Sequence, residues 1–229
     1  MEEDFAEYSS TADMLSDPRG IYSVAEDVNP GRMSLDLSTG YGVSDRSMRY
    51  DYVGVGCTSQ TIGRNLTLPS PVAEVWVEFY VKFSTNLTTL NPLGCGTPPD
   101  YKFIFGRLTP DGFGRFAIRW GSQTPPQITV ESAGNHVDLY TGEFIARYSD
   151  LRWHQVRAHW NVGPSGSPAT LVQTWVEGKL IYDKRDFVVT GRPLIWSLAL
   201  GRNMDQGLPN AIMSVWWGRV RAWQTDPGW

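Results

Sequence analysis

In residues 74–83, Glu-Val-Trp-Val-Glu-Phe-Tyr-Val-Lys-Phe, every second residue is Val or Phe, and the residues between them are Glu, Trp, Tyr or Lys. Successive residues of a β-strand point to opposite faces of a sheet, so this segment is predicted to be a strand that is buried on one side only. Such a strand needs a second layer over its apolar face, which is typical of a sandwich of two antiparallel sheets. The apolar face carries Val75, Val77, Phe79, Val81 and Phe83, and the other face carries Glu74, Trp76, Glu78, Tyr80 and Lys82.

Similar alternating segments, separated by Gly, Pro, Asn or Asp, continue from about residue 46 onward. The only helix expected is one or two turns at 9–16, behind a serine cap. Many strands without intervening helices favour an all-β antiparallel sandwich, and 229 residues suit one large domain. Further strands are predicted at 47–53, 101–107, 114–120, 127–131, 152–160, 170–177, 179–188, 194–201 and 212–223.

Charge is unevenly distributed along the chain. Residues 1–36 hold nine acidic residues and two arginines, whereas the remainder is mildly basic. We therefore expect two parts: residues 1–45, an acidic N-terminal arm with a first strand, and residues 46–229, the sandwich. The net charge of −4 argues against nucleic-acid binding, which needs a clustered basic surface. No apolar run is long enough to cross a bilayer and no signal-peptide pattern opens the sequence, so we expect no membrane partner.

The two cysteines, Cys57 and Cys95, stand in similar glycine-flanked loops. A disulfide between them and a pair of reduced thiols are both consistent with the sequence, because the absence of a signal pattern favours synthesis under reducing conditions. We expect no metal and no cofactor. Asp100, Asp111 and Asp205 fall in predicted turns where calcium could bind, but no set of carboxylates has ligand spacing.

Three segments carry a resemblance to a known family. They are Arg-Trp-His-Gln-Val-Arg-Ala-His-Trp at 152–160, Leu-Val-Gln-Thr-Trp-Val-Glu-Gly-Lys-Leu-Ile at 171–181, and Val-Trp-Trp-Gly-Arg-Val-Arg-Ala-Trp at 215–223. With 74–83 they resemble the concanavalin A-like lectin/glucanase superfamily, including its laminin-G-like and polysaccharide-lyase-like branches. The resemblance spans roughly 46–225 and implies a concanavalin A-like jelly roll. It does not imply one function, because that fold carries lectins, hydrolases, lyases and structural modules.

A candidate binding face follows if strands 74–83, 114–120, 152–160 and 170–177 share the concave sheet. Aromatic, arginine and amide side chains together suit sugars, whose apolar faces stack on rings while their hydroxyls bond to planar groups. The same residue types are enriched in contacts between subunits, which is the alternative. This face would show Trp76, Glu78, Tyr80, Arg115 or Arg119, Gln155, Arg157, His159, Gln173 and Trp175.

Two enzyme hypotheses can be tested against motifs. The glucanase pattern Glu-x-Asp-x-x-Glu occurs only at residues 2–7, outside any strand, so we interpret it as a chance match. For a polysaccharide lyase, Arg157 would neutralise the uronate carboxylate, Gln173 would hold it, His159 would act as base and Tyr80 as acid. However, the alginate-lyase-like strings Arg-x-Glu-Leu-Arg, Gln-Ile-His and Tyr-Phe-Lys-x-Gly are missing.

The two other histidines are weaker candidates, His136 in a Gly-Asn loop and His154 lining the core. The sequence thus favours a non-enzymatic, lectin-like jelly-roll protein. It resembles phage structural proteins, which would make it a virion surface, decoration or assembly protein. Its partners would be capsid subunits or further copies of itself, with polysaccharide as a ligand. The alternatives are a polysaccharide lyase acting by β-elimination on a uronic-acid polymer and a secreted carbohydrate-binding module, which would be extracellular.

Overall fold

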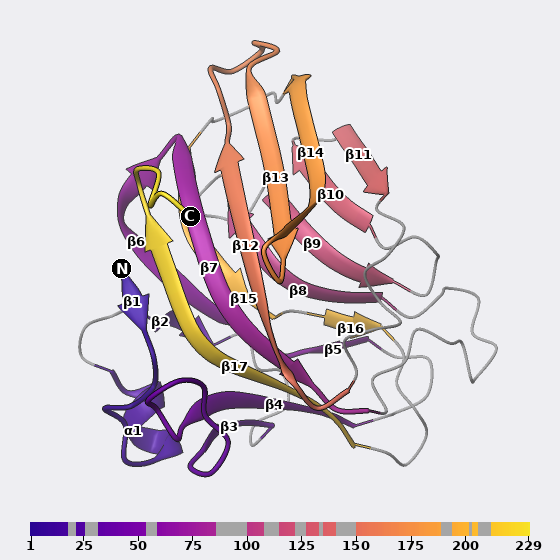
Figure 1. Cartoon of the computed structure of the whole chain (residues 1–229). Coiled ribbons are helices and arrows are strands. Elements are labelled where there is room, and N and C mark those ends of the chain that lie inside the picture. Colours follow the sequence, from indigo (N-terminus) through magenta and orange to yellow (C-terminus); the bar gives the residue numbers. More distant parts are fainter. Residues whose placement is uncertain are drawn as a thin grey trace, which may run out of the picture.

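The computed structural model describes residues 1–17, 22–25, 32–53, 59–85, 100–107, 115–121, 127–132, 135–140, 150–188, 194–201, 203–205 and 212–229. Two sheets pack face to face, and neighbouring strands of the described residues pair in the antiparallel sense (Figure 1). The expected antiparallel β-sandwich of the jelly-roll type is confirmed. Cys57, Cys95 and Asp111 lie outside the described residues.

The first sheet has the strand order β14-β13-β12-β7-β17-β4-β3, with β1 paired to β17. Its strands are β14 (Lys179–Phe187), β13 (Thr170–Val176), β12 (Trp153–Asn161), β7 (Glu74–Phe83), β17 (Ile212–Trp223), β4 (Ser47–Val53), β3 (Met33–Asp36) and β1 (Glu2–Glu3).

The second sheet has the order β11-β10-β9-β8-β15-β6-β2, and β16 joins β8 to β5 at one end. Its strands are β11 (Asn135–Tyr140), β10 (Gln127–Ser132), β9 (Arg115–Gly121), β8 (Asp100–Arg107), β15 (Ile195–Leu200), β6 (Arg64–Val72), β2 (Tyr22–Ala25), β16 (Asn203–Asp205) and β5 (Ser59–Thr61). Asp100 and Asp205, expected in turns, are directly paired strand positions instead.

The core lies between the sheets and follows the predicted alternation. All five apolar residues of β7 are buried, as are the inward positions of β12 and β13. Trp160 and Trp217 are the largest fully buried side chains. Gly106 on the second sheet leaves room for Trp160, because a Cβ there would stand 2.7 Å from Trp160 Cζ3. Close packing of the two sheets therefore depends on a glycine facing a tryptophan.

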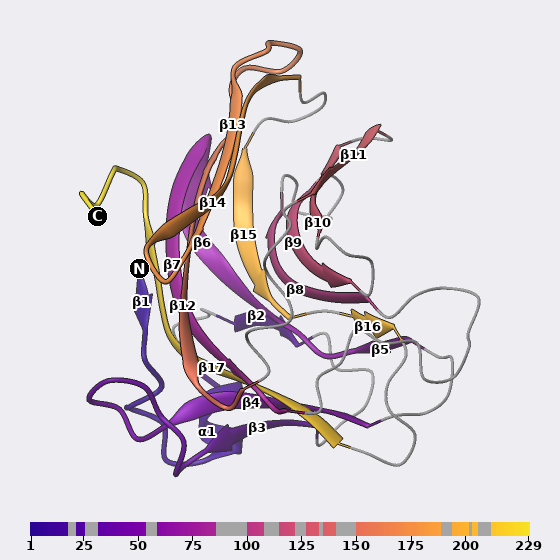
Figure 2. The same ribbon diagram turned by 45° about the vertical axis from the view of Figure 1, so that its right-hand side comes forward.

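Both sheets curve in the same sense, with β8, β9 and β10 on the inner side of the curve (Figure 2). The concave face is therefore the outer face of the second sheet. The expectation that 74–83, 114–120, 152–160 and 170–177 share one concave sheet is wrong. β7, β12 and β13 belong to the first sheet, whereas β9 is paired between β8 and β10 in the second.

The described part of residues 1–45 packs onto the sandwich rather than lying outside it. Phe5, Tyr8 and Met14 are buried in the core, and the Met1 amino group donates to Ala222 O at 2.8 Å. The short helix α1 (Thr11–Leu15) forms behind Ser10, whose Oγ accepts from the Asp13 amide as the sequence predicts. The expectation of a separate arm is thus corrected for these residues, and the division at residue 45 stays a prediction.

Two longer strands, β6 and β11, were not expected from the sequence. β6 contains Pro69 and Pro71, which cannot donate backbone hydrogen bonds. Its register with β15 is interrupted between Thr67 and Val72, so both prolines fall where the ladder is irregular.

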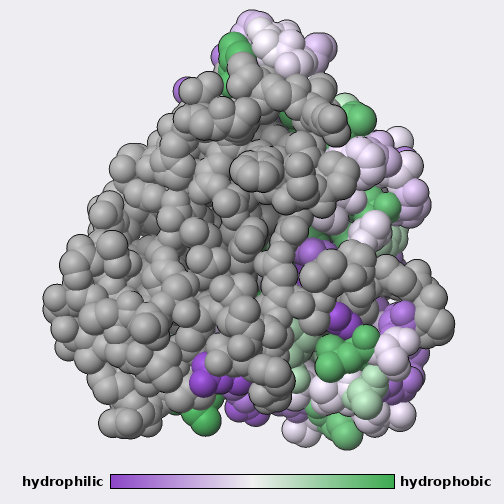
Figure 3. Space-filling model, turned by 180° about the vertical axis from the view of Figure 1, so that it is seen from behind, coloured by the Kyte–Doolittle hydropathy of each residue, from purple (hydrophilic) through white to green (hydrophobic). Residues whose placement is uncertain are grey.

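The exposed large hydrophobic residues are spread over separate elements. Figure 3 shows the molecule from behind. In the coloured part of this view, hydrophobic residues are interspersed with hydrophilic ones. Among the described residues, no helix has the length and apolar character needed to span a membrane.

Gly106→Ala should destabilise the fold by about 1–3 kcal/mol, because the added methyl group overlaps the Trp160 ring. Equilibrium unfolding in urea measures this loss. In a Trp160→Phe background the same change should cost less, since the smaller ring leaves space. Equal costs in the two backgrounds would show that Trp160 is not the obstacle.

Candidate functional site

A row of charged residues crosses the outer face of the first sheet. We call Arg157, Glu78, Arg221 and Glu2 the charge row, because the register pairs them in this order across β12, β7, β17 and β1. Arg157 Nε donates to Glu78 Oε2 at 2.9 Å, and Arg221 Nη1 lies 3.5 Å from Glu78 Oε1. Arg221 Nε also lies 3.2 Å from Glu2 Oε1. The charges of the row therefore compensate one another.

Glu78 is the buried member of this row. Its side chain is 5% exposed, and Gln155 Nε2 adds a third donor at 2.8 Å. A buried carboxylate is stable only when it is paired and hydrogen-bonded, so donors from both neighbouring strands are a structural requirement.

Aromatic residues gather around Trp76 on the same face. The His159 ring stacks on Trp76 with ring centres 3.6 Å apart, and Trp175 lies 6.3 Å away on the next strand but one. Trp229 meets Trp76 edge-on at 5.7 Å and Trp223 at 5.2 Å. We call these residues the tryptophan cluster: Trp76, His159, Trp175, Trp223 and Trp229.

His159 is enclosed by a network of hydrogen bonds. Its Nε2 lies 2.6 Å from Glu74 Oε1, and its Nδ1 lies 3.1 Å from Gln173 Oε1. Gln173 in turn donates to Asp183, and hydrogen bonds from Arg185 lower the pKa of the Asp183 carboxyl against the opposing effect of burial. With 6% of its side chain exposed and both ring nitrogens engaged, His159 is poorly placed to take a proton from a substrate.

A second aromatic group lies at the other end of the face. Tyr41 stacks on Tyr80 at 3.6 Å and meets Trp153 edge-on at 5.9 Å. Burial raises the pKa of Tyr41 to about 12, and the hydrogen bond with Tyr80 and the negative charge of Glu78 add to this.

The proposed lyase set on this face is not assembled into one site. Tyr80 pairs with Gln155 and His159 pairs with Trp76, which places the intended acid and base four positions apart along the sheet. At about 3.3 Å per residue this is about 13 Å, too far for both to act on one sugar ring. Arg119 belongs to β9 of the other sheet, so it does not join this face either. The residues that the structure does bring together are Trp76, Glu78, Arg157, His159, Gln173 and Trp175.

The other histidine of β12, His154, is buried as expected but is bonded at both ring nitrogens. Nε2 lies 2.9 Å from Asp150 and Nδ1 lies 3.2 Å from Glu177. Glu177 and Gly178 both have positive φ, which is the tight hairpin that the Glu-Gly-Lys sequence predicts. His154 thus ties this turn to the start of β12.

The second sheet carries a row of titratable and charged residues that includes a histidine. The register pairs His136 with Glu131, Glu131 with Arg115, and Arg115 with Arg107, across β11, β10, β9 and β8. We call these four positions the His136 row. The four residues occupy directly paired positions on neighbouring strands, so their Cα positions form one line across the second sheet.

Sequence reasoning missed this row because it placed His136 in a loop. The signal that could have found it is the alternation of Val137 and Leu139 with His136, Asp138 and Tyr140. That pattern is short and lies beside a Gly-Asn pair, which favours a turn.

No family model matches this sequence, and no curated protein matches it either. Solved structures resemble its fold over nearly the whole chain. An endo-β-1,4-glucuronan lyase from the fungus Trichoderma reesei superposes with a TM-score of 0.68 at 12% identity, covering 98% of this chain and 95% of that one. A PL-14 alginate lyase from Aplysia kurodai gives 0.66 at 12% identity, covering 98% of each chain. The alginate lyase Aly36B gives 0.58 at 11% identity, covering 97% and 95%.

These neighbours overturn the prediction of a non-enzymatic, lectin-like virion protein, since structures similar over their full length are polysaccharide lyases. The non-enzymatic interpretation was wrong because it relied on the absence of the alginate-lyase-like strings. At an identity of 11–12% such strings can be absent although the fold is shared. The link to phage structural proteins has no support among these structures. The expected partners and location stay predictions.

Glu78→Gln should destabilise the protein by about 3 kcal/mol, because two arginines would lose a buried counter-charge. Asp183→Asn is the matched control on the same face, where the ion pair with Arg185 is exposed and its loss should cost less than about 1 kcal/mol. Urea unfolding of both variants measures the difference, and equal losses would contradict the importance of burial.

The raised pKa of Tyr41 predicts a pH dependence of stability. Because the folded value, about 12, exceeds the ordinary value of 10, the contribution is complete below pH 10 and declines as the pH rises towards 12. Tyr41→Phe should remove that part of the decline in denaturant titrations across this range. An unchanged alkaline profile would refute the assignment to Tyr41.

Proposed function

We propose that this protein is a polysaccharide lyase that cleaves a uronic-acid polymer by β-elimination. The observation that carries the proposal is the fold likeness over 95–98% of the length of enzymes whose names state glucuronan or alginate as substrate. At 11–12% identity the likeness extends to the fold, so residues must be assigned from the chemistry of this chain.

The reaction sets three requirements. A base removes the proton on C5 of the uronate, and the electron pair of that bond forms the C4–C5 double bond. The bond between C4 and the glycosidic oxygen breaks, and the departing oxygen takes up a proton. Negative charge grows towards the carboxylate as the C5 proton leaves, so cationic donors beside the carboxylate stabilise the transition state.

The paired positions of the His136 row offer two of these functions on the second sheet. His136 is the base in this proposal, because a neutral imidazole accepts a proton near neutral pH. Arg115, two strands away at about 10 Å, is the carboxylate partner, since its planar fork binds carboxylates in a bidentate manner. Arg107 on the following strand adds positive charge to the same row.

Incubating the protein with polyglucuronate or alginate should release oligosaccharides with an unsaturated end, which absorb in the ultraviolet. His136→Ala should lower kcat by about 100-fold or more, as expected for loss of a general base. Arg115→Lys should lower it too, because an ammonium group cannot bind the carboxylate in a bidentate manner.

His159→Ala decides between the two faces. If His159→Ala is inactive and His136→Ala keeps its activity, the reaction takes place on the first sheet. That result would overturn the assignment of His136 as the base. Absence of unsaturated product from every uronic-acid polymer tried would overturn the proposed function itself.

A further inference from the structure

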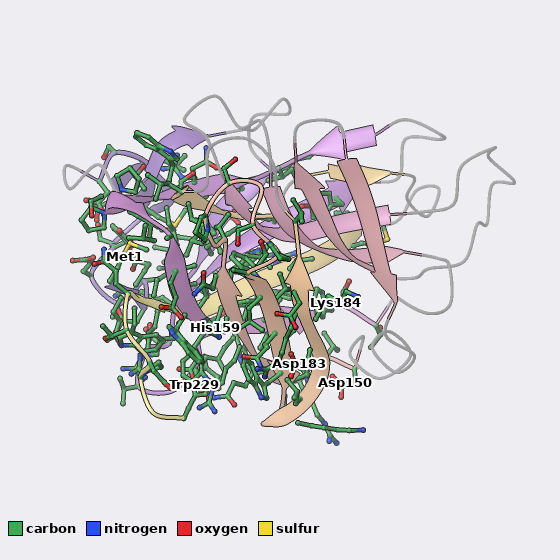
Figure 4. All side chains as sticks on the ribbon, turned by 90° about the horizontal axis from the view of Figure 1, so that it is seen from above. Met1, Asp150, His159, Asp183, Lys184 and Trp229 are labelled. Atoms are coloured by element: carbon green, nitrogen blue, oxygen red, sulfur yellow. The ribbon has the colours of Figure 1, made fainter. Side chains whose placement is uncertain are left out.

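The segment after β17 folds back over the outer face of the first sheet. Trp229 lies beside Trp76 and Trp223, and the Arg157 guanidinium covers its ring with the carbon 4.7 Å from the ring centre. Figure 4 labels Trp229 and His159, which belong to this cluster. Trp229 is thus the outermost layer of the tryptophan cluster.

Among the residues that the structure describes, ring contacts join this segment to the sheet. Within residues 224–229 the Gly228 amide donates to Asp226 Oδ1 at 2.8 Å, and no hydrogen bond joins these residues to another described residue. The indole N–H groups of Trp76 and Trp229 are both buried, and neither has a hydrogen-bond acceptor among the described residues. A buried donor without an acceptor loses the hydrogen bond that it would make with water, so the packed state of the segment is less favourable than its ring contacts suggest.

Displacing Trp229 would leave a surface with defined chemistry. Trp76 is held flat by His159 on one side, and Trp175 extends the aromatic area. Arg157 uses Nε for Glu78, so its terminal nitrogens would be left to donate to a carboxylate above the ring. A flat ring beside a fixed guanidinium matches a uronate unit, with its apolar face on the indole and its carboxylate on the arginine.

We propose that the tryptophan cluster and Arg157 form a binding site for a uronate unit of an acidic polysaccharide, and that residues 224–229 cover this site and compete with the sugar. The site rests on the proposed function for its substrate class. It lies on the opposite sheet from the His136 row, so it would hold a stretch of polymer away from the bond being cleaved.

The competition gives a direct test by affinity electrophoresis of the whole chain through gels containing polyglucuronate or alginate. Trp229→Ala should increase retardation, with the dissociation constant falling about tenfold. Only molecules whose site is uncovered can bind the sugar, so covering the site weakens the apparent affinity in proportion, and the variant removes the cover. Arg157→Gln should abolish the retardation. Arg152→Gln is the matched control, because it removes the same charge from an exposed arginine near the start of the same strand.

Thermal unfolding of each variant verifies that it is folded, and Trp229→Ala is informative in any case because its expected effect is a gain. Equal or weaker retardation of Trp229→Ala, or equal losses in Arg157→Gln and Arg152→Gln, would overturn the inference. Unsaturated product without any effect of Trp229→Ala on retardation would refute this site alone. Stronger retardation of Trp229→Ala without unsaturated product would refute the lyase and leave the site supported.

Discussion

The outer face of the first sheet is organised by one buried carboxylate. Glu78 stands on β7, between β12 and β17, and accepts hydrogen bonds from Gln155 and Arg157 on one side while Arg221 approaches from the other. Because a charge in this position must be compensated, both arginines are fixed across their neighbouring strands. The orientation of Arg157 over the Trp229 ring follows from the same constraint.

The two outer faces of the sandwich have different properties. On the first sheet the charges are paired with one another and the aromatic rings are stacked, so that face suits holding a ligand by its shape and apolar surface. On the second sheet the register lines up the positions of His136, Glu131, Arg115 and Arg107, to which we assign proton transfer and charge neutralisation in the proposed reaction. In this proposal binding is assigned to the first sheet and chemistry to the second, with the core between them.

How far sequence predicts this structure depends on the range of the interactions. The segments 74–83 and 212–223 are both strands with the bounds that the sequence predicts. Alternation accounts for the first, whose apolar face is buried, whereas residues 213–218 of the second are all buried. The sheet to which 115–121 belongs could not be predicted, since pairing partners are distant in the chain. β6 was not predicted, because Pro69 and Pro71 indicate the end of a strand. In the structure the irregular pairing with β15 accommodates both prolines. The contact of Trp229 with Trp76 is likewise set by tertiary structure.

The pairing of β17 has a consequence for the order in which the chain folds. β7 lies at the centre of the first sheet, yet one of its two partners comes from residues 212–223, and the register joins Trp76 to Trp223. During synthesis one edge of β7 and one edge of β4 stay unpaired until β17 has been made. Such late, distant pairing makes folding slow and leaves a hydrophobic strand edge open meanwhile, which favours assistance by chaperones.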